Sequence, residues 1–324
     1  MVSTSILWVG GRQWLALSVN ALLDLIRQPI LLLMTLFGIG FIGLMPVFSV
    51  FTLGDEMRLV RDGALATFFI VSACLSSYAA AATLNRELTH GTAAMVLCKP
   101  IGRELFYAAK LSGVLILLGF MLLIFLPVIL LSERMAMTGI ETDWTVGGAL
   151  YSATGMALVL GALWNYAGKQ PFVSSTFLCL LPCLWLALIA AAGVDPLGHG
   201  IPFGALISWS TIPVIVLCAL AAAVLASAAL ALSTRLAPVF TLCFCGVFFS
   251  LTLLATPLWP ASACGAGWVK VLLPNWQLFW MLDVLADRGA CPWSYVQLCG
   301  VYALAWILAW ACLGLASFRH RDIE

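Results

Sequence analysis

Charged residues are scarce in this chain of 324 residues. Only 9% of its residues are Asp, Glu, Lys or Arg, whereas 63% are hydrophobic and the mean hydropathy is +1.09. A soluble domain has about 25% charged residues, which help to cover its surface with groups that water solvates. So few charges exclude a cytosolic enzyme, a nucleic-acid-binding protein with a basic face and a disordered chain. The sequence therefore predicts a protein whose main solvent is the lipid bilayer.

The few charges leave eight long apolar runs between them. A helix needs roughly 20 apolar residues to cross a hydrocarbon core of about 30 Å. The runs are continuously apolar rather than alternating, which favours helices over a closed barrel as the way to satisfy peptide groups in lipid. We place the predicted spans at 30–52, 64–83, 111–131, 146–166, 172–192, 205–231, 237–258 and 294–317. The expected fold is one all-α polytopic bundle over residues 1–324.

Basic residues divide unevenly between the two sides of these spans. Eight spans put both termini on one side, which then holds ten of the 15 Lys and Arg residues, while the other side holds five. Loops rich in Lys and Arg stay in the cytoplasm. The distribution therefore predicts that both termini are cytoplasmic.

Residues 11–28 precede the first span and have an amphipathic pattern. At 100° per residue, one stripe of the predicted helix carries the polar side chains Gln13, Asn20, Asp24 and Arg27. Such a helix lies in the membrane interface, with Trp14 at the depth of the headgroups. The alternative is a short additional helix of the core.

Sequence motifs for catalysis and nucleotide binding are missing. Gly168-Lys169 lacks the remainder of a Walker A loop, and no H-E-x-x-H, G-x-S-x-G or C-x-x-C occurs. No Asp, Glu, Lys, Arg or His falls in a predicted span, whereas ion-coupled transporters generally carry ionisable groups there. We therefore expect no enzymatic activity, no metal and no cofactor in this chain, and a source of energy outside the membrane.

Two ladders of small residues at intervals of four predict close helix packing. We favour packing within the chain over a seam between two copies as the role of these ladders. Their residues are Ala149, Ala153, Ala157 and Gly161 in the first, and Ala219, Ala223, Ser227 and Ala231 in the second.

The predicted outer segment 259–293 contains two cysteines and a group of aromatic residues. Cys264 and Cys291 would lie in an oxidising compartment, where they either pair or remain free thiols. The aromatic residues predict an outer interfacial helix that anchors the chain, gates an exit path or receives a periplasmic partner. They are Trp276, Phe279 and Trp280.

The predicted cytoplasmic segment 85–110 joins the second and third spans. It starts as a short helix to Thr89, breaks at Gly91, continues as an apolar stretch and turns at Lys99-Pro100. Apolar residues framed by charges suit docking to another protein. An ordinary interfacial loop is the alternative.

The same segment resembles the permease subunits of bacterial type 2 ABC transporters. Those proteins carry E-x-x-x-G-T and K-P-[IV]-x-R elements between their second and third spans, and here Glu87, Gly91-Thr92, Lys99-Pro100 and Arg103 match them. The ending Phe318-Arg319-His320-Arg321-Asp322 is similar to the F-x-x-R-D close of the family, and Ser233-Thr234-Arg235 is also familiar from bacterial members.

The family usually has six spans. Eight spans in this chain are a departure from that number, which points to an inserted pair near 146–192.

The resemblance implies an ATP-driven, exporting permease in the bacterial inner membrane. Such a subunit pairs with a second permease subunit, identical or different, and with separate ABC ATPase subunits that bind the ATP. Segment 85–104 would act as the coupling helix, and 11–28 as the interfacial elbow. The residues implied in ATPase coupling are Glu87, Gly91, Thr92, Lys99, Pro100 and Arg103. The alternative function is a membrane assembly or mechanotransmission subunit that acts on a periplasmic partner without carrying a substrate.

The predicted topology can be tested with two single-cysteine variants, one that retains only Cys98 and one that retains only Cys264. In intact cells a membrane-impermeant maleimide should label Cys264 and leave Cys98 unlabelled, because only Cys264 is expected outside. Labelling of Cys98 under these conditions would invert the topology, and lysed cells control for its reactivity.

Overall fold

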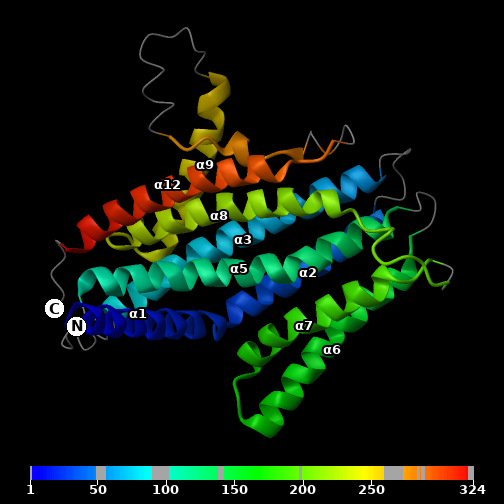
Figure 1. Cartoon of the computed structure of the whole chain (residues 1–324), viewed down its shortest axis with the longest axis horizontal. Helices are drawn as coiled ribbons and strands as arrows, with labels where there is room; N and C mark the ends of the chain where they lie inside the picture. The colour runs from blue at the N-terminus through cyan, green and yellow to red at the C-terminus, as the bar shows by residue number, and fades with distance from the viewer. Residues whose placement is uncertain are drawn as a thin grey trace.

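The structure of the chain is a computed structural model that describes residues 2–48, 56–89, 102–137, 142–196, 199–258, 273–282, 285 and 289–319. Across these residues the named elements are helices, and none is a strand. Seven helices in this part of the chain are long and apolar enough to cross a membrane. The predicted all-α polytopic bundle is therefore confirmed (Figure 1).

Each of the eight predicted spans falls on one helix of the bundle. The long apolar helices are α2 (Pro29–Phe48), α3 (Glu56–Thr89), α5 (Arg103–Met135), α6 (Trp144–Gly168), α7 (Phe172–Ala192), α8 (Ile212–Ser233) and α12 (Trp293–Arg319). The remaining span falls on α9 (Pro238–Leu258), where the apolar helix over Pro238–Leu254 is shorter than the others. Two 3₁₀ turns, η2 (Trp209–Thr211) and η3 (Trp276–Phe279), complete the named elements.

The predicted helix at 11–28 is part of α1 (Val2–Ile26), which starts earlier than expected and lies along α5 (Figure 1). The two helices approach closely, since the Ser18 and Ser112 hydroxyl oxygens are 2.7 Å apart. A Cβ added at Gly113 would lie only 2.8 Å from the Cβ of Ala21. The opposite face of α1 exposes apolar side chains such as Leu15. Its position in the membrane interface stays a prediction.

Helix α8 forms the centre of the bundle, with α3, α5 and α12 packed around it. Its small-residue ladder is buried throughout, from Ala219 to Ala231. At Gly314 of α12 an added Cβ would lie 2.9 Å from the Cα of Ala231, so the glycine lets the two helices approach at this point. This ladder therefore packs within the chain, as predicted, rather than at a seam between two copies.

Helices α6 and α7 form an antiparallel hairpin that leans away from the other helices (Figure 1). The first small-residue ladder faces α7, and a Cβ added at Gly161 would lie 2.7 Å from the Cα of Thr176. Much of the rest of α6 is exposed and apolar, including Met156 and Leu163. The hairpin coincides with the region where the sequence suggests an inserted pair, and its helices pack mainly on each other.

The bundle has two distinct ends. At the one we call the termini end, α1 and α5 begin and α8 and α12 end. At the other, the distal end, α3, α6 and α8 begin and α5 and α7 end. Helix α1 therefore begins, and α12 ends, at the same end of the molecule (Figure 1). That this end is cytoplasmic remains a prediction of the charge distribution.

The close contact at Gly161 predicts that Gly161→Leu will destabilise the α6–α7 hairpin. The added side chain has no room against α7, and overpacking a well-packed contact costs about 1–3 kcal/mol. Thermal unfolding of the purified protein in detergent should show a lower Tm. The matched control is Gly155→Leu on the same helix, where nothing lies within 4 Å of an added Cβ. Equal Tm values for the two variants would contradict the packing.

Candidate functional site

At the termini end, the first turn of α5 contacts the last residue of α12. The Arg103 Nη1 donates a hydrogen bond of 2.9 Å to the carbonyl oxygen of Arg319. The Arg319 guanidinium in turn forms an ion pair with the Glu104 carboxylate. Residues that are 216 positions apart in the sequence thus meet through charge-assisted hydrogen bonds.

The end of α8 joins the same group of residues. The Thr234 hydroxyl donates a hydrogen bond of 2.9 Å to the Ser317 hydroxyl oxygen, to which the Nε of Arg235 also donates, at 3.1 Å. Below this surface, the Phe318 ring stacks on Phe106 at 6.0 Å between centroids. We call the surface group the motif cluster: Arg103, Glu104, Thr234, Arg235, Ser317 and Arg319.

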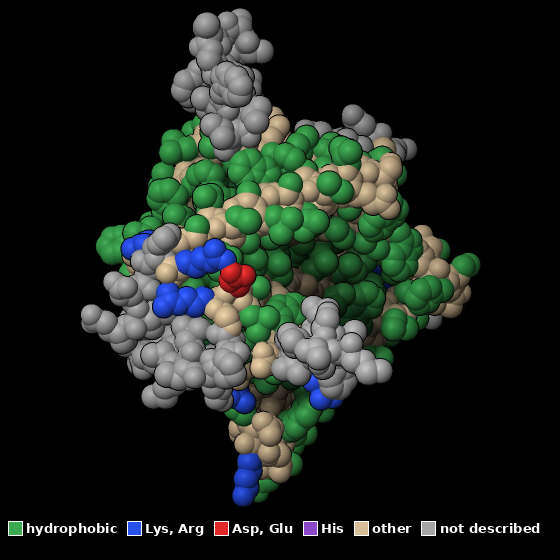
Figure 2. All heavy atoms as spheres, turned by 60° about the vertical axis from the view of Figure 1, so that its left-hand side comes forward, with side chains coloured by type: hydrophobic (Ala, Val, Ile, Leu, Met, Phe, Trp, Pro, Cys, Tyr) green, Lys and Arg blue, Asp and Glu red, His purple; other side chains and the backbone are tan. Residues whose placement is uncertain are grey.

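The charged side chains of the motif cluster are exposed, whereas Thr234 is buried beneath them. Figure 2 turns this end forward and shows basic side chains gathered around acidic ones. A shallow cavity of about 550 Å³ opens beside Gly102, Arg103 and Arg319. Exposed ion pairs contribute only about 0–1 kcal/mol to stability. The main contribution of these charges is therefore to the shape and potential of the surface.

Only one of the six residues implied in ATPase coupling has a described side chain. Arg103 lies in the motif cluster. Glu87 lies in the last turn of α3, and its backbone alone is described. Gly91, Thr92, Lys99 and Pro100 lie outside the described residues, so a joint contact of the six stays a prediction.

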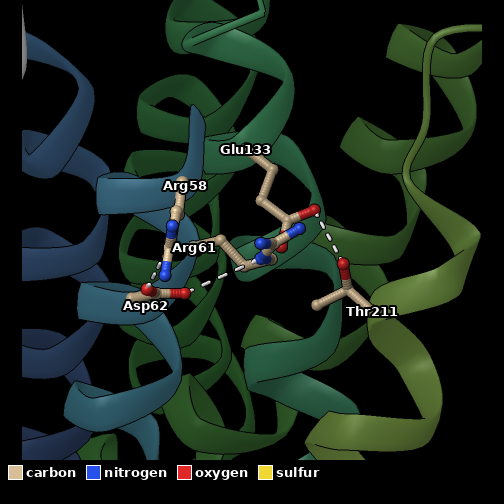
Figure 3. Close-up of polar contacts among 5 residues, drawn as sticks. All are labelled: Arg58, Arg61, Asp62, Glu133 and Thr211. Atoms are coloured by element: carbon tan, nitrogen blue, oxygen red, sulfur yellow. Dashed lines mark hydrogen bonds and ion pairs between the residues drawn. The ribbon is translucent and has the colours of Figure 1, made fainter. Parts of the chain in front are cut away.

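At the distal end, charged side chains lie inside the helical bundle (Figure 3). Glu133 of α5 is fully buried, and the Thr211 hydroxyl donates a hydrogen bond of 3.0 Å to its Oε2. Arg61 of α3 is 8% exposed and its guanidinium points toward Glu133. Asp62 lies 3.8 Å from both Arg61 and Arg58, measured from Nε to the carboxylate oxygens. We call Arg58, Arg61, Asp62 and Glu133 the distal charge cluster.

No ionisable residue lies within a predicted span, but the helices that carry two of these spans extend into buried turns that contain Arg61 and Glu133. Helix α3 begins at Glu56, eight residues before the predicted span, and α5 continues to Met135, four residues beyond its span. Charges that the sequence analysis assigns to loops therefore lie on buried helical turns. A helical signal was available, because no Gly or Pro separates Glu133 from the preceding apolar run.

Arg134, next to Glu133, fastens α5 to the end of α7. Its guanidinium donates hydrogen bonds to the carbonyl oxygens of Ala191 and Val194. The last carbonyl groups of a helix have no partner within the helix, and a cation there also interacts favourably with the helix dipole. The distal end is thus held by two buried arginines, of which Arg61 faces Glu133 and Arg134 caps α7.

Several polar atoms of the distal charge cluster are left unsatisfied. In the part of the chain that the structure describes, neither Oε1 of Glu133 nor Nε of Arg61 has a hydrogen-bond partner. Buried polar groups without partners are rare and costly. No group of three His, Cys, Asp or Glu that could hold a metal occurs among the described residues. The cluster connects α3, α5 and the start of α8, since Glu133 of α5 faces Arg61 of α3 and accepts a hydrogen bond from Thr211.

In the predicted outer segment, Trp276 and Phe279 lie in a 3₁₀ turn, η3, and Trp280 follows it, while their position in the membrane interface stays a prediction. Trp276 and Phe279 are 4% and 2% exposed, because their rings pack against Phe249 and Tyr302 of neighbouring helices. Only Trp280 remains exposed, at 42%. The turn is tied to α12 by Tyr295, whose hydroxyl donates to the Leu278 carbonyl oxygen at 2.8 Å.

The two cysteines of this segment are not brought together by a described contact. Cys264 lies outside the described residues. Cys291 is buried, and this burial raises the pKa of its thiol. The pairing of Cys264 with Cys291 stays a prediction.

Comparison of the sequence with models of known families and with curated proteins gives no match.

The distal charge cluster predicts that Arg61→Met destabilises the protein more than Arg58→Met. Removal of one partner from a buried charge pair costs about 3–5 kcal/mol, whereas an exposed pair contributes about 0–1 kcal/mol. The Arg58 side chain is 52% exposed and serves as the matched control. Unfolding of the variants in detergent, followed by tryptophan fluorescence, measures the difference.

A double variant separates charge from packing at this site. Glu133→Gln keeps an acceptor for the Thr211 hydroxyl and removes the negative charge. Combined with Arg61→Met, it should recover part of the lost stability, because no uncompensated buried charge remains. Simple additivity of the two single losses would show that Arg61 and Glu133 do not interact.

Proposed function

We propose that the chain is the permease subunit of an ATP-driven exporter of the type 2 ABC class, in a bacterial inner membrane. The observation that carries the proposal is the motif cluster. Three short elements that resemble the family, around Arg103, Thr234 and Phe318, are distant in sequence and adjacent in the structure. The support lies in their direct contacts, because a shared end of the bundle follows already from the alternation of the helices.

The motif cluster includes residues of the proposed docking segment 85–104, so its location suits a contact with an ATPase. Residues 102–104 of the proposed docking segment are described and lie at the start of α5, where Arg103 belongs to the cluster. An ABC ATPase that docks on residues 85–104 would therefore also face Arg103, Glu104 and Arg319. Charged, solvated side chains in that position can set the orientation of a partner.

Two helices connect the proposed docking end to the distal charge cluster. Helix α3 has 34 residues, about 50 Å at 1.5 Å per residue, and it carries Glu87 near one end and Arg61 near the other. Helix α5 similarly runs from Arg103 to Glu133. A displacement of both helices by the ATPase would change how Arg61 meets Glu133. Energy from ATP binding could in this way select between two arrangements of the bundle.

The alternative function, a mechanotransmission subunit without a substrate, uses the same two helices. In this alternative, the motion of the helices acts on a periplasmic partner at the distal end. In export, the same motion moves a transported molecule. ATP-dependent uptake of candidate substrates into inverted vesicles separates the two functions.

The coupling proposal predicts that Glu87→Arg and Gly91→Trp weaken association with the ATPase. Reversal of a charge or a large ring in the docking segment should reduce binding by about tenfold or more, which corresponds to about 1.4 kcal/mol. The chain and the ABC ATPase encoded nearest to it are co-expressed, co-purified and assayed for ATP turnover.

The matched control is Glu56→Arg, the same substitution in the first turn of the same helix at the distal end. It should leave co-purification unchanged. ATPase association and turnover that are the same in Glu87→Arg, Gly91→Trp and the unmodified chain would overturn the assignment of residues 85–104.

A further inference from the structure

A cavity of about 700 Å³ lies between α3, α8, α9 and η3, apart from the motif cluster and the distal charge cluster. Sites for small molecules in proteins measure about 300–1,000 Å³, so this cavity is large enough to hold one. Neither the proposed ATPase contact nor the charged residues of the distal end use it.

The inner wall of the cavity is apolar and largely aromatic. Phe69, Trp276 and Phe279 line it and are all less than a tenth exposed. The ring of Phe249 links two of them, at 5.4 Å from Phe69 and 5.2 Å from Trp276 between centroids. The indole N–H of Trp276 is satisfied by the Thr252 hydroxyl. The wall therefore offers aromatic rings to a ligand and leaves the polar atom of Trp276 paired.

The mouth of the cavity is also mainly apolar. Ile70, Leu253 and Trp280 line the cavity and are 59%, 41% and 42% exposed. Gln277 is exposed beside them and supplies one amide group. A ligand that matches this lining is apolar along most of its length and carries a polar group at one end.

The depth of the cavity places its mouth against hydrocarbon rather than water. Phe69 lies seven residues beyond Asp62, about 10 Å along α3 toward the middle of the helix. From residue 63 to residue 85 this helix has no charged side chain. In a bilayer, the molecules that reach the mouth at this depth are therefore those dissolved in the lipid.

We propose that the cavity binds the hydrocarbon chain of an amphiphile, whose polar group lies near Gln277. A hydrocarbon chain gains dispersion contacts with the aromatic rings, and it reaches the mouth without leaving the membrane. The hydrocarbon chain of the ligand belongs either to a resident membrane lipid or to a soluble amphiphile that partitions into the bilayer. This proposal does not rest on ATPase coupling, because the site lies within one chain and is tested without the ATPase.

The test uses the full chain in vesicles of phosphatidylethanolamine that carry a photoreactive diazirine on one acyl chain. After illumination and proteolysis, mass spectrometry maps the labelled peptides. We expect labelling concentrated on the peptides that contain Phe69, Cys218 and Trp276. Labelling spread evenly over the exposed apolar faces, such as the α12 face at Val301 and Leu308, would overturn the proposal.

Variants that fill the cavity make the test specific. Ala66 lines the cavity and is half-buried, so Ala66→Trp should fill it and remove most of the labelling at Trp276. The matched control is Ala305→Trp on the exposed face of α12, which should leave that labelling unchanged. Ala221→Phe fills the same cavity from α8 and replaces the first variant if that one does not fold. Undiminished labelling in a folded filled variant would contradict the assignment.

A competition experiment distinguishes a resident membrane lipid from a soluble amphiphile as the source of the bound hydrocarbon chain. An excess of a dissolved fatty alcohol should displace the photoreactive lipid if the cavity exchanges amphiphiles, and should leave the labelling intact if a membrane lipid resides there. Both results support a hydrocarbon site. Labelling that depends on the lipid headgroup and not on the position of the diazirine in the chain would exclude it.

Discussion

Lipid offers no hydrogen bonds to peptide groups or charges, and the architecture of this chain follows from that constraint. Every predicted apolar run becomes a helix, because only a helix satisfies its own backbone in such a solvent. Apart from Arg12 in α1, the charged residues of the described helices lie toward the helix ends. The same constraint explains why the two ends differ. At the termini end Arg103 and Arg319 are exposed, although Lys110 is buried with its ammonium group over the Phe106 ring. At the distal end Glu133 and Arg61 are enclosed by protein and depend on their partners.

Close packing by small residues complements this arrangement. Lipid tails are as apolar as leucine, so helices in a membrane associate through close contact and hydrogen bonds rather than through hydrophobic burial. Helix α8 shows the consequence, since its ladder from Ala219 to Ala231 lets three neighbours pack around it. The α6–α7 hairpin uses the same device at Gly161 on a smaller scale. Two separate packing units thus share one chain, and only the larger one contains the motif cluster.

The sequence predicts the number and location of the helices well, because apolar length is a local property. It fails at the helix ends for a physical reason. Predicted span 111–131 ends at the last apolar residue of the run. Helix α5 continues beyond it, because the buried Glu133 accepts a hydrogen bond from Thr211, which is 78 positions away in the sequence. The burial of Trp276 is not predicted from the sequence either, because its ring packs against Phe249 of another helix. Arg103 and Arg319 belong to two separate sequence motifs, and their contact becomes apparent only in the folded structure. Local patterns therefore indicate the elements, while the sites depend on long-range pairs.

The charge-free part of α3 restricts how this helix can move. Residues 63–85 measure about 34 Å, close to the thickness of the hydrocarbon core, and they are bounded by Asp62 on one side and Arg86 on the other. Sliding the helix by one turn, about 5.4 Å, in either direction would draw one of these charges into hydrocarbon, at a cost that the opposite end does not return. Piston-like translation is therefore disfavoured. Tilting and rotation about the helix axis keep both charges at their boundaries, so a signal that travels along α3 takes one of these two forms.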